Sequence, residues 1–164
     1  MHDPPYPIRP FADIDLERIR ALIHRTIDRS YGAVYPPRAL PFFKRFHDAE
    51  TIRTRASSGL VLVLEEDGRP TGTGALVEGE ILGVFVDPDR QGGGRGRALM
   101  RALEGEAVRQ GRDACTLSIS LPSRRFYERL GYRTLDERTR DLGDGQVLRF
   151  WKGVKRLTPT DAAP

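Results

Sequence analysis

The alternation of hydrophobic and polar residues divides the chain into helical and extended segments. Apolar residues spaced three or four positions apart predict amphipathic helices, which fall at residues 16–27, 41–57, 99–107 and 123–130. Shorter apolar or alternating runs, rich in β-branched residues, predict strands, which fall at residues 8–11, 60–65, 70–77, 81–86, 114–121, 132–135 and 146–154. Turn residues separate these segments, and Asp67-Gly68 is a strong hairpin signal.

The resulting order of elements, β-α-α-β-β-β-α-β-α-β-β, is typical of an α+β domain. We therefore expect a mixed, mostly antiparallel central sheet flanked by about four helices. With 164 residues the chain is long enough for one domain with its own core, so residues 1–164 are predicted to form a single domain. The polar segment 158–164, which contains Pro and Ala, is predicted to be a disordered tail.

Residues 81–100 carry the most distinctive pattern in the chain. The apolar strand 81–86 is followed by Pro88, by a loop with four glycines at positions 92, 93, 94 and 96, and by the start of a helix. Glycine lets the backbone approach a ligand closely and adopt positive φ at little cost. Because free backbone N–H groups then point at one spot beside a helix N-terminus, this loop predicts an anion site, with phosphate as the expected anion.

Three glycine patterns compete for this loop. A nucleoside-triphosphate loop needs Lys and then Ser or Thr after its last glycine, whereas Arg97-Ala98 follows Gly96. The dinucleotide pattern G-x-G-x-x-G fails because Arg97 and Leu99 stand where its third glycine would be. The pattern Gln-x-x-Gly-x-Gly matches residues 91–96 at every fixed position. A merely flexible loop remains the alternative.

A second motif follows about thirty residues later. It contains the pairs Phe126-Tyr127 and Gly131-Tyr132, with Ser120 and Ser123 ahead of them. Together with the glycine loop it resembles the GCN5-related N-acetyltransferase (GNAT) family, whose closing signature has Asn, a small residue three positions on, an aromatic-Tyr pair and a Gly-aromatic pair. Ser120 stands at the Asn position, which is a departure. The resemblance spans roughly residues 8–154, and its specific motifs lie in 84–100 and 117–132.

The resemblance implies acetyl-CoA as cosubstrate and no metal. In the family, the loop N–H groups hold the CoA pyrophosphate, and a strand edge pairs with the pantetheine amides where the sheet splays, here between the strands at 81–86 and 114–121. Ser120 would hydrogen-bond the pantetheine arm or be solvated, and the Arg95 side chain would assist a phosphate or be solvated. The implied cofactor-binding residues are Val84, Phe85, Val86, Gln91, Gly92, Gly93, Gly94, Arg95, Gly96, Arg97 and Ser120.

The chemistry of acetyl transfer to an amine points to catalytic candidates. A thiol has a pKa of about 8.5 and a tyrosine about 10, so the Tyr127 phenol is protonated at neutral pH and can donate to a departing thiolate; packing beside Phe126 is the alternative. An attacking amine must be neutral, which calls for a base. Glu80 is the first candidate, with Glu78 or a water chain as alternatives.

The acceptor is expected to bind between the first two helices. Tyr31 and Tyr35 flank the helix break that contains Gly32 and Pro36, and they are the candidate substrate-binding residues, with packing as the alternative. The predicted partner is a small-molecule or peptide amine, and the sequence leaves its identity open.

Composition and charge narrow the function classes. The formal net charge is +4, and no basic run is interleaved with aromatic residues, so a nucleic-acid partner is not expected. The single cysteine, Cys115, excludes an internal disulfide framework and is predicted to be a core thiol. No signal pattern and no apolar run of membrane-span length is present, so no membrane partner and a cytoplasmic location are expected. A homodimer is left open.

The sequence therefore predicts an acyl-CoA-dependent N-acetyltransferase that moves an acetyl group from acetyl-CoA to a primary amine by direct transfer in a ternary complex. A non-catalytic module that binds or senses acyl-CoA is the alternative. A dinucleotide-dependent enzyme is a third reading, which would be stabilised by NAD rather than by CoA.

Overall fold

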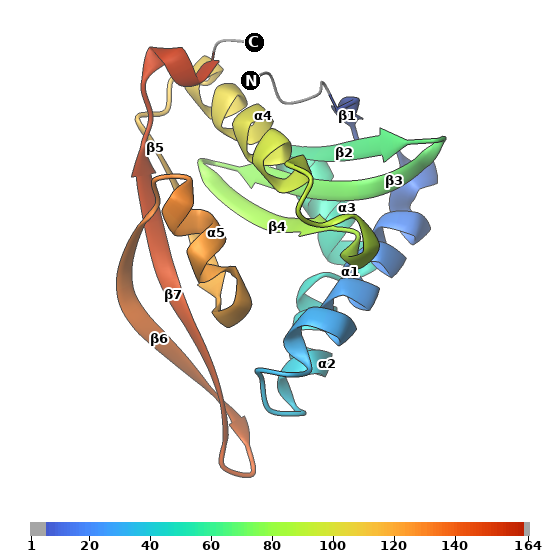
Figure 1. The fold of residues 1–164 in the computed structure, drawn as a ribbon, viewed down its shortest axis with the longest axis vertical. Coiled ribbons are helices and arrows are strands. Elements are labelled where there is room, and N and C mark those ends of the chain that lie inside the picture. The colour runs from blue at the N-terminus through green and yellow to red at the C-terminus, as the bar shows by residue number, and fades with distance from the viewer. Residues whose placement is uncertain (1–5, 163–164) are drawn as a thin grey trace.

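A seven-stranded sheet forms the centre of the computed structural model, which describes residues 6–162 (Figure 1). The strand order is β1-β2-β3-β4-β5-β7-β6, and every neighbouring pair is antiparallel except β4 and β5. The strands are β1 (Ile8–Pro10), β2 (Leu60–Glu66), β3 (Arg69–Val77), β4 (Glu80–Val86), β5 (Ala114–Ser120), β6 (Arg133–Gly143) and β7 (Gln146–Arg156). The predicted α+β fold with a mixed, mostly antiparallel sheet is confirmed.

Five α-helices cover the sheet within the same residues, and short 3-10 turns connect some of the elements. The helices are α1 (Leu16–Tyr31), α2 (Ala39–Phe46), α3 (Ala49–Ser58), α4 (Arg95–Arg109) and α5 (Arg124–Arg129). The core has two parts, one on each face of the sheet. Helices α4 and α5 pack on one face with Leu62 and Leu64, whereas α1, α2 and α3 pack on the other with Val63. This follows from the alternation of side chains along β2.

The helix predicted over 41–57 is wrong as a single element. It divides into α2 and α3, because His47 leaves the helical region at φ −126° and ψ 42°. Asp48 then caps α3 by accepting a hydrogen bond of 2.8 Å from the Thr51 backbone N–H. The chain therefore has five α-helices in its described part, where about four were expected.

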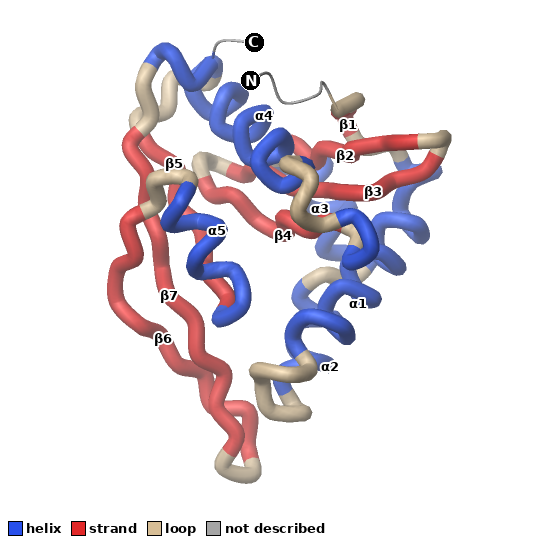
Figure 2. Tube along the Cα trace, viewed as in Figure 1, coloured by secondary structure: helices blue, strands red, loops and turns tan. Residues whose placement is uncertain are grey.

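The strand predicted over 132–135 is much longer in the structure, since β6 continues to Gly143. Its outer part is polar and mostly exposed, so the hydrophobic pattern carries little sign of a strand there. Figure 2 shows β6 and β7 running together past α5 to a loop. Near that loop, the Arg38 side chain donates to the Leu142 carbonyl (3.0 Å), and the Arg38 backbone N–H donates to Gln146 Oε1 (2.9 Å). The hairpin is thereby tied to the segment before α2.

The end of the chain differs from the predicted disorder over 158–164. Pro159–Ala162 forms a 3-10 turn beside α4, where a Cβ added at Gly105 would lie 3.1 Å from the Asp161 carbonyl oxygen. Residues 163 and 164 lie outside the described part of the chain.

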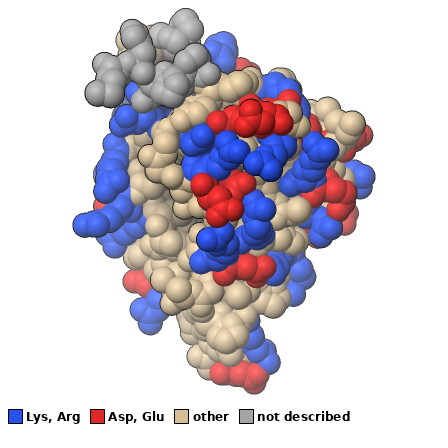
Figure 3. Space-filling view, turned by 45° about the vertical axis from the view of Figure 1, so that its right-hand side comes forward, with Lys and Arg blue, Asp and Glu red and all other residues tan. Residues whose placement is uncertain are grey.

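Charged side chains of both signs are interspersed on the face shown in Figure 3. Many form ion pairs, such as Arg25 with Asp87 (2.8 Å) and Arg29 with Asp89 (2.7 Å). Exposed pairs of this kind contribute little to stability. Among residues 6–162, no helix has the length and apolarity needed to cross a bilayer.

Candidate functional site

The sheet opens between β4 and β5. These strands pair only at Glu80 with Thr116 and at Ile81 with Leu117, and they diverge beyond those positions. The pairing of β3 with β4 shifts register between Thr73 and Ala75, opposite Gly83, which has a φ of +59°. A bulge of this kind bends a strand and leaves backbone groups unpaired. The predicted splay between the strands at 81–86 and 114–121 is confirmed.

Two pockets occupy this opening and meet in its middle. One has a cavity volume of about 270 Å³ and the other about 470 Å³. Tyr31, Val84, Phe85 and Ser123 line both of them. The two pockets therefore adjoin at these residues; we call them the loop pocket (about 470 Å³) and the aromatic pocket (about 270 Å³), and together the slot.

The loop pocket collects nearly all of the predicted cofactor residues. Val84, Phe85, Val86, Gln91, Gly92, Gly94, Arg95, Gly96 and Arg97 all line it. Gly93 is not among the lining residues, and its carbonyl accepts a hydrogen bond from the Tyr6 hydroxyl. Ser120 lines the aromatic pocket instead. The structure thus brings the strand edge and the glycine loop to one surface.

Backbone conformation explains why this loop is rich in glycine. Gly92 and Gly94 have φ values of +86° and +84°, which L side chains rarely adopt. Gly94 is the N-cap of α4, so the N–H groups of the first helical turn, at residues 95–97, have no partner inside the helix. These donors sit at the positive end of the helix dipole, an arrangement that fits a phosphate oxygen.

The Arg95 side chain lies at the edge of the loop pocket and is engaged by Glu66 and Tyr6. Its Nε donates to Glu66 Oε2 at 2.7 Å and its Nη2 to Glu66 Oε1 at 2.9 Å, while the guanidinium lies 4.9 Å from the centre of the Tyr6 ring. Hydrogen bonds from Arg95, and then from Thr71, lower the pKa of Glu66 to about 2. The side chain therefore anchors the loop to the end of β2, whereas the backbone N–H of Arg95 is still available to an anion.

Tyr127 lies at the aromatic pocket with its hydroxyl free of the protein. Its ring packs edge-on against Phe126 and Tyr132, with centroids 5.0 and 5.8 Å away. No group within residues 6–162 hydrogen-bonds this hydroxyl. Because every fully buried side-chain oxygen and nitrogen in these residues has a hydrogen-bond partner, the Tyr127 hydroxyl is not fully buried, and it faces the cavity. Burial of the ring raises the pKa of Tyr127, so the phenol stays protonated and can donate.

A cluster of hydroxyl groups marks the junction of the two pockets. The Oγ atoms of Ser120 and Ser123 are 2.8 Å apart. Burial raises the pKa of Tyr31, and the nearby Ser120 and Ser123 hydroxyls partly offset that shift. Tyr31 thus lies where the two pockets adjoin, between the predicted cofactor and acceptor sides.

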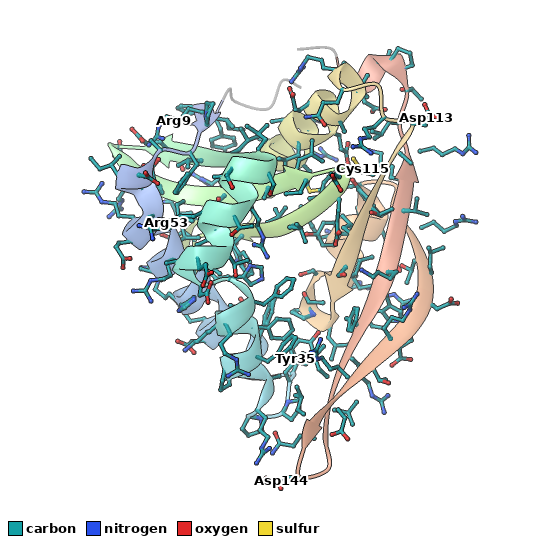
Figure 4. The ribbon with its side chains drawn as sticks, turned by 180° about the vertical axis from the view of Figure 1, so that it is seen from behind. Arg9, Tyr35, Arg53, Asp113, Cys115 and Asp144 are labelled. Carbon is teal, nitrogen blue, oxygen red and sulfur yellow. The ribbon has the colours of Figure 1, made fainter. Side chains whose placement is uncertain are left out.

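Tyr35 does not line either pocket. Its hydroxyl donates to the Arg149 carbonyl at 2.9 Å and accepts from the Leu121 N–H at 2.8 Å. Figure 4 shows it among the aromatic rings between α2 and the β6–β7 hairpin. Burial raises its pKa to about 12. Its hydrogen bonds and position fit the packing alternative, and acceptor binding by Tyr35 stays a prediction.

Glu80 lines the aromatic pocket, whereas Glu78, the weaker candidate base, is exposed in the β3–β4 turn and lines neither pocket. No ion pair within residues 6–162 engages Glu80. Its carboxylate acts electrostatically on the buried Arg55 guanidinium, whose Nη1 donates to His47 Nδ1 at 2.9 Å. Burial, and then the Arg55 charge, lowers the pKa of His47 to about 3, so its ring is neutral at pH 7.

Sequence reasoning missed several side chains that line the aromatic pocket. Phe42, Phe43 and Phe46 come from α2, Ser118 from β5, Arg140 from β6, and Leu148, Phe150 and Lys152 from β7. The apolar face of α2 was visible in the sequence as a packing surface. Arg140 lies beyond the predicted end of its strand, so no signal placed it beside α2.

Cys115 lies apart from the slot. Its side chain is buried and lines neither pocket, and Figure 4 shows it on the sheet far from Tyr35. Burial, helped by the Glu104 carboxylate, raises the pKa of the thiol to about 11. A thiol of this kind is a poor nucleophile, as the predicted core role requires. Within residues 6–162, no group of three His, Cys, Asp or Glu side chains is arranged to hold a metal ion.

Comparison with known proteins gives one family match. A family model described as an acetyltransferase (GNAT) domain matches residues 32–144, which is more than half of the chain. A comparison with curated proteins finds no match.

Solved structures with the same fold span almost the whole chain. A GCN5-related N-acetyltransferase from Rhodopseudomonas palustris has 24% identity and a TM-score of 0.85, and the alignment covers 96% of this chain and 99% of that one. The PaiA N-acetyltransferase from Thermoplasma acidophilum, solved with coenzyme A, has 18% identity and a TM-score of 0.74 over 93% and 99% of the two chains. The yncA protein of Salmonella typhimurium, solved with acetyl-CoA, has 23% identity and a TM-score of 0.66 over 94% and 95%.

Proposed function

The chain belongs to the GNAT acetyltransferase family, and from that premise we propose that it transfers an acetyl group from acetyl-CoA to a primary amine by direct transfer in a ternary complex. We take residues 1–164 as one N-acetyltransferase domain. The observation that carries the proposal is the slot itself. Its loop pocket contains the anion-binding backbone, its aromatic pocket contains Glu80 and Tyr127, and the two pockets meet at Tyr31 and Ser123.

The loop pocket would hold acetyl-CoA. The backbone N–H groups of residues 95–97 and the loop before them would bind the pyrophosphate. The unpaired part of β4, from Leu82 to Val86, would hydrogen-bond the pantetheine amides as an added strand does. Two proteins of the same fold were solved with coenzyme A or acetyl-CoA, which supports this assignment.

The aromatic pocket would hold the amine. Glu80 would accept a proton from the amine nitrogen as that nitrogen forms a bond to the acetyl carbon. The carbon–sulfur bond then breaks, and the Tyr127 hydroxyl donates a hydrogen bond to the leaving thiolate. Because burial raises the pKa of this phenol far above that of a thiol, Tyr127 stabilises the thiolate by donation and keeps its own proton. Solvent supplies the proton that makes the free thiol and removes the one held by Glu80.

Direct transfer needs no acyl-enzyme. Cys115, the one cysteine of the chain, is buried and has a raised pKa. We expect that incubation with acetyl-CoA alone leaves the intact mass of the protein unchanged. An added mass of one acetyl group on Cys115 would contradict the direct mechanism.

The function is tested by thiol release from acetyl-CoA over a panel of amines, with the N-acetyl product identified by mass spectrometry and cofactor binding measured by calorimetry. Turnover with at least one amine supports the proposal. Tight CoA binding with no turnover on any amine would instead support a non-catalytic acyl-CoA sensor. Stabilisation by NAD and not by CoA would indicate a dinucleotide enzyme.

A further inference from the structure

The aromatic pocket has walls of two kinds. Three phenylalanines of α2, with Phe150 of β7, form an apolar wall: Phe42, Phe43, Phe46 and Phe150. Phe46 is 47% exposed and Phe42 is half-buried, and their rings are stacked with centroids 6.4 Å apart. Partly exposed rings beside a cavity offer apolar contact to whatever enters it.

Two cations line the pocket beside these rings. Arg140 of β6 and Lys152 of β7 both line the pocket. Lys152 Nζ donates to Ser118 Oγ at 2.9 Å, and the Arg140 guanidinium lies 4.8 Å from the centre of the Phe42 ring. Neither forms an ion pair with a carboxylate within residues 6–162, whereas Arg25, Arg29 and Lys155 do. Both cations are therefore available to an anionic group on a ligand.

The charge of the pocket selects among amines. Glu80 is the one carboxylate among its lining residues, against two permanent cations, and His47 is neutral. A polyamine or an aminoglycoside would bring several positive charges toward Arg140 and Lys152 and would be repelled. An amine that carries its own carboxylate would instead pair with them.

The two cations are suited to this task in different ways. A guanidinium stacked on a ring keeps its N–H edge free for two parallel hydrogen bonds to a carboxylate. Lysine supplies a mobile point charge from the neighbouring strand. The cavity volume of about 270 Å³ is below the usual range for drug-sized ligands, which favours a small acceptor.

On the basis of the proposed function, we propose that the acceptor is a small amine bearing a carboxylate and an apolar, preferably aromatic, body: an aromatic amino acid or a close analogue. Its carboxylate pairs with Arg140 and Lys152, its ring packs on Phe42, Phe46 and Phe150, and its amine faces Glu80. Polyamines and peptide N-termini, which lack the nearby carboxylate, are poor acceptors.

The test compares L-phenylalanine with L-phenylalaninamide as acceptors in steady-state kinetics with saturating acetyl-CoA. The amide keeps the ring and loses only the anionic charge. The amine of the amide is also less basic than the amine of the acid, so a larger fraction of it is neutral. A preference for the acid must therefore outweigh this advantage of the amide. Because hydrogen bonds to charged groups contribute roughly 1.5–3 kcal/mol, we expect kcat/KM to favour the acid by about tenfold to a hundredfold.

The variant Arg140→Gln tests whether Arg140 binds the carboxylate of the acceptor. We expect it to raise KM for phenylalanine with little change in kcat, and to remove most of the preference for the acid over the amide. Arg149→Gln is the matched control, since Arg149 also lies in the β6–β7 hairpin but is 63% exposed and lines neither pocket. It should keep the wild-type preference.

Several outcomes would overturn the inference while leaving the proposed function intact. These are an amide that reacts as well as the acid, spermidine as a better acceptor than either, or an Arg140→Gln variant that loses activity equally toward acid and amide. A protein that binds CoA but acetylates no amine at all would overturn the proposed function as well, so the two failures are distinguishable.

Discussion

The two halves of the slot are built from different material. In the loop pocket, the groups aimed at the ligand are backbone N–H and C=O groups, presented by the glycine loop and by the unpaired end of β4. In the aromatic pocket they are side chains, contributed by α1, α2, β4, β5, α5, β6 and β7. A backbone site constrains φ and ψ, so it leaves glycines at fixed spacing. A side-chain site assembled from seven elements leaves no comparable local pattern.

This difference shows which part of each residue matters. In the loop pocket the side chains support the backbone, and Arg95 illustrates this because its side chain is engaged by Glu66 and anchors the loop. The aromatic pocket depends on each side chain separately. The predictions that follow separate the two halves by measuring acetyl-CoA affinity and turnover independently.

The largest effect is expected from Glu80→Gln. Removing the base should lower kcat by about 10²- to 10⁴-fold, because general-base catalysis typically contributes that much, and acetyl-CoA affinity should be unchanged. Initial rates and calorimetry on the same preparation check this. A rate that recovers steeply at high pH, where more of the amine is neutral, would support the assignment. If kcat stays within a factor of three of the wild type, a water chain takes the place of Glu80.

Tyr127→Phe should lower kcat by about 10²- to 10³-fold, since loss of a donor to a developing anion costs that much in comparable sites. The hydroxyl has no partner in the described part of the chain, so the ring should keep its packing on Phe126 and Tyr132 and the fold should be unaffected. Tyr35→Phe is the matched control. It removes two hydrogen bonds outside both pockets, so its effect should appear in the melting temperature. Unchanged turnover in Tyr127→Phe would remove this residue from the mechanism.

Gly94→Val addresses the loop pocket alone. A β-branched residue at a φ of +84° is strained by roughly 1–3 kcal/mol, and the loop will shift to relieve that strain. We expect acetyl-CoA affinity to fall about tenfold to a hundredfold, while kcat at saturating cofactor changes little. Calorimetric titration with CoA gives the affinity directly. An unchanged affinity would contradict the assignment of this loop to the phosphate.

The smallest effect is expected on the stability that the Arg95–Glu66 ion pair, which anchors the loop, gives to the fold. The pKa of Glu66 is lowered from 4.5 to about 2 by its hydrogen bonds, Arg95 first, so the stabilisation is fully present above about pH 4.5 and is lost as the pH falls toward 2. The wild type should therefore lose stability between these values more steeply than Glu66→Gln does. Denaturant unfolding across that pH range measures the difference. Parallel pH profiles for the two proteins would show that the anchor contributes nothing.

The fold was largely predictable because its signals are local. Strands such as 81–86 and helices such as 99–107 follow from apolar spacing, and the structure places elements at both. Two signals were weak. Asp48 is an N-cap that divides the helix over 41–57, and the outer part of β6, an edge strand that pairs only with β7, is mostly polar and exposed.

The candidate site divides in the same way. Residues 91–97 were identified from spacing, as were Tyr127 and Ser120 from the second motif. Tyr35 was placed in the acceptor pocket on its position beside a helix break, and the structure turns it toward β7. Arg140, Lys152 and the α2 phenylalanines were not identified as pocket residues, since they come together only across the hairpin.

By itself, the sequence determined the order of elements and most residues of the loop pocket, because glycine spacing and hydrophobic periodicity are properties of neighbouring residues. The tertiary structure decided the aromatic pocket. The splay of β4 from β5 opens the space, and the β6–β7 hairpin carries Arg140 and Lys152 beside the rings of α2. Contacts between residues as far apart in the chain as Phe42 and Arg140 depend on the packing of whole elements, which no local pattern records.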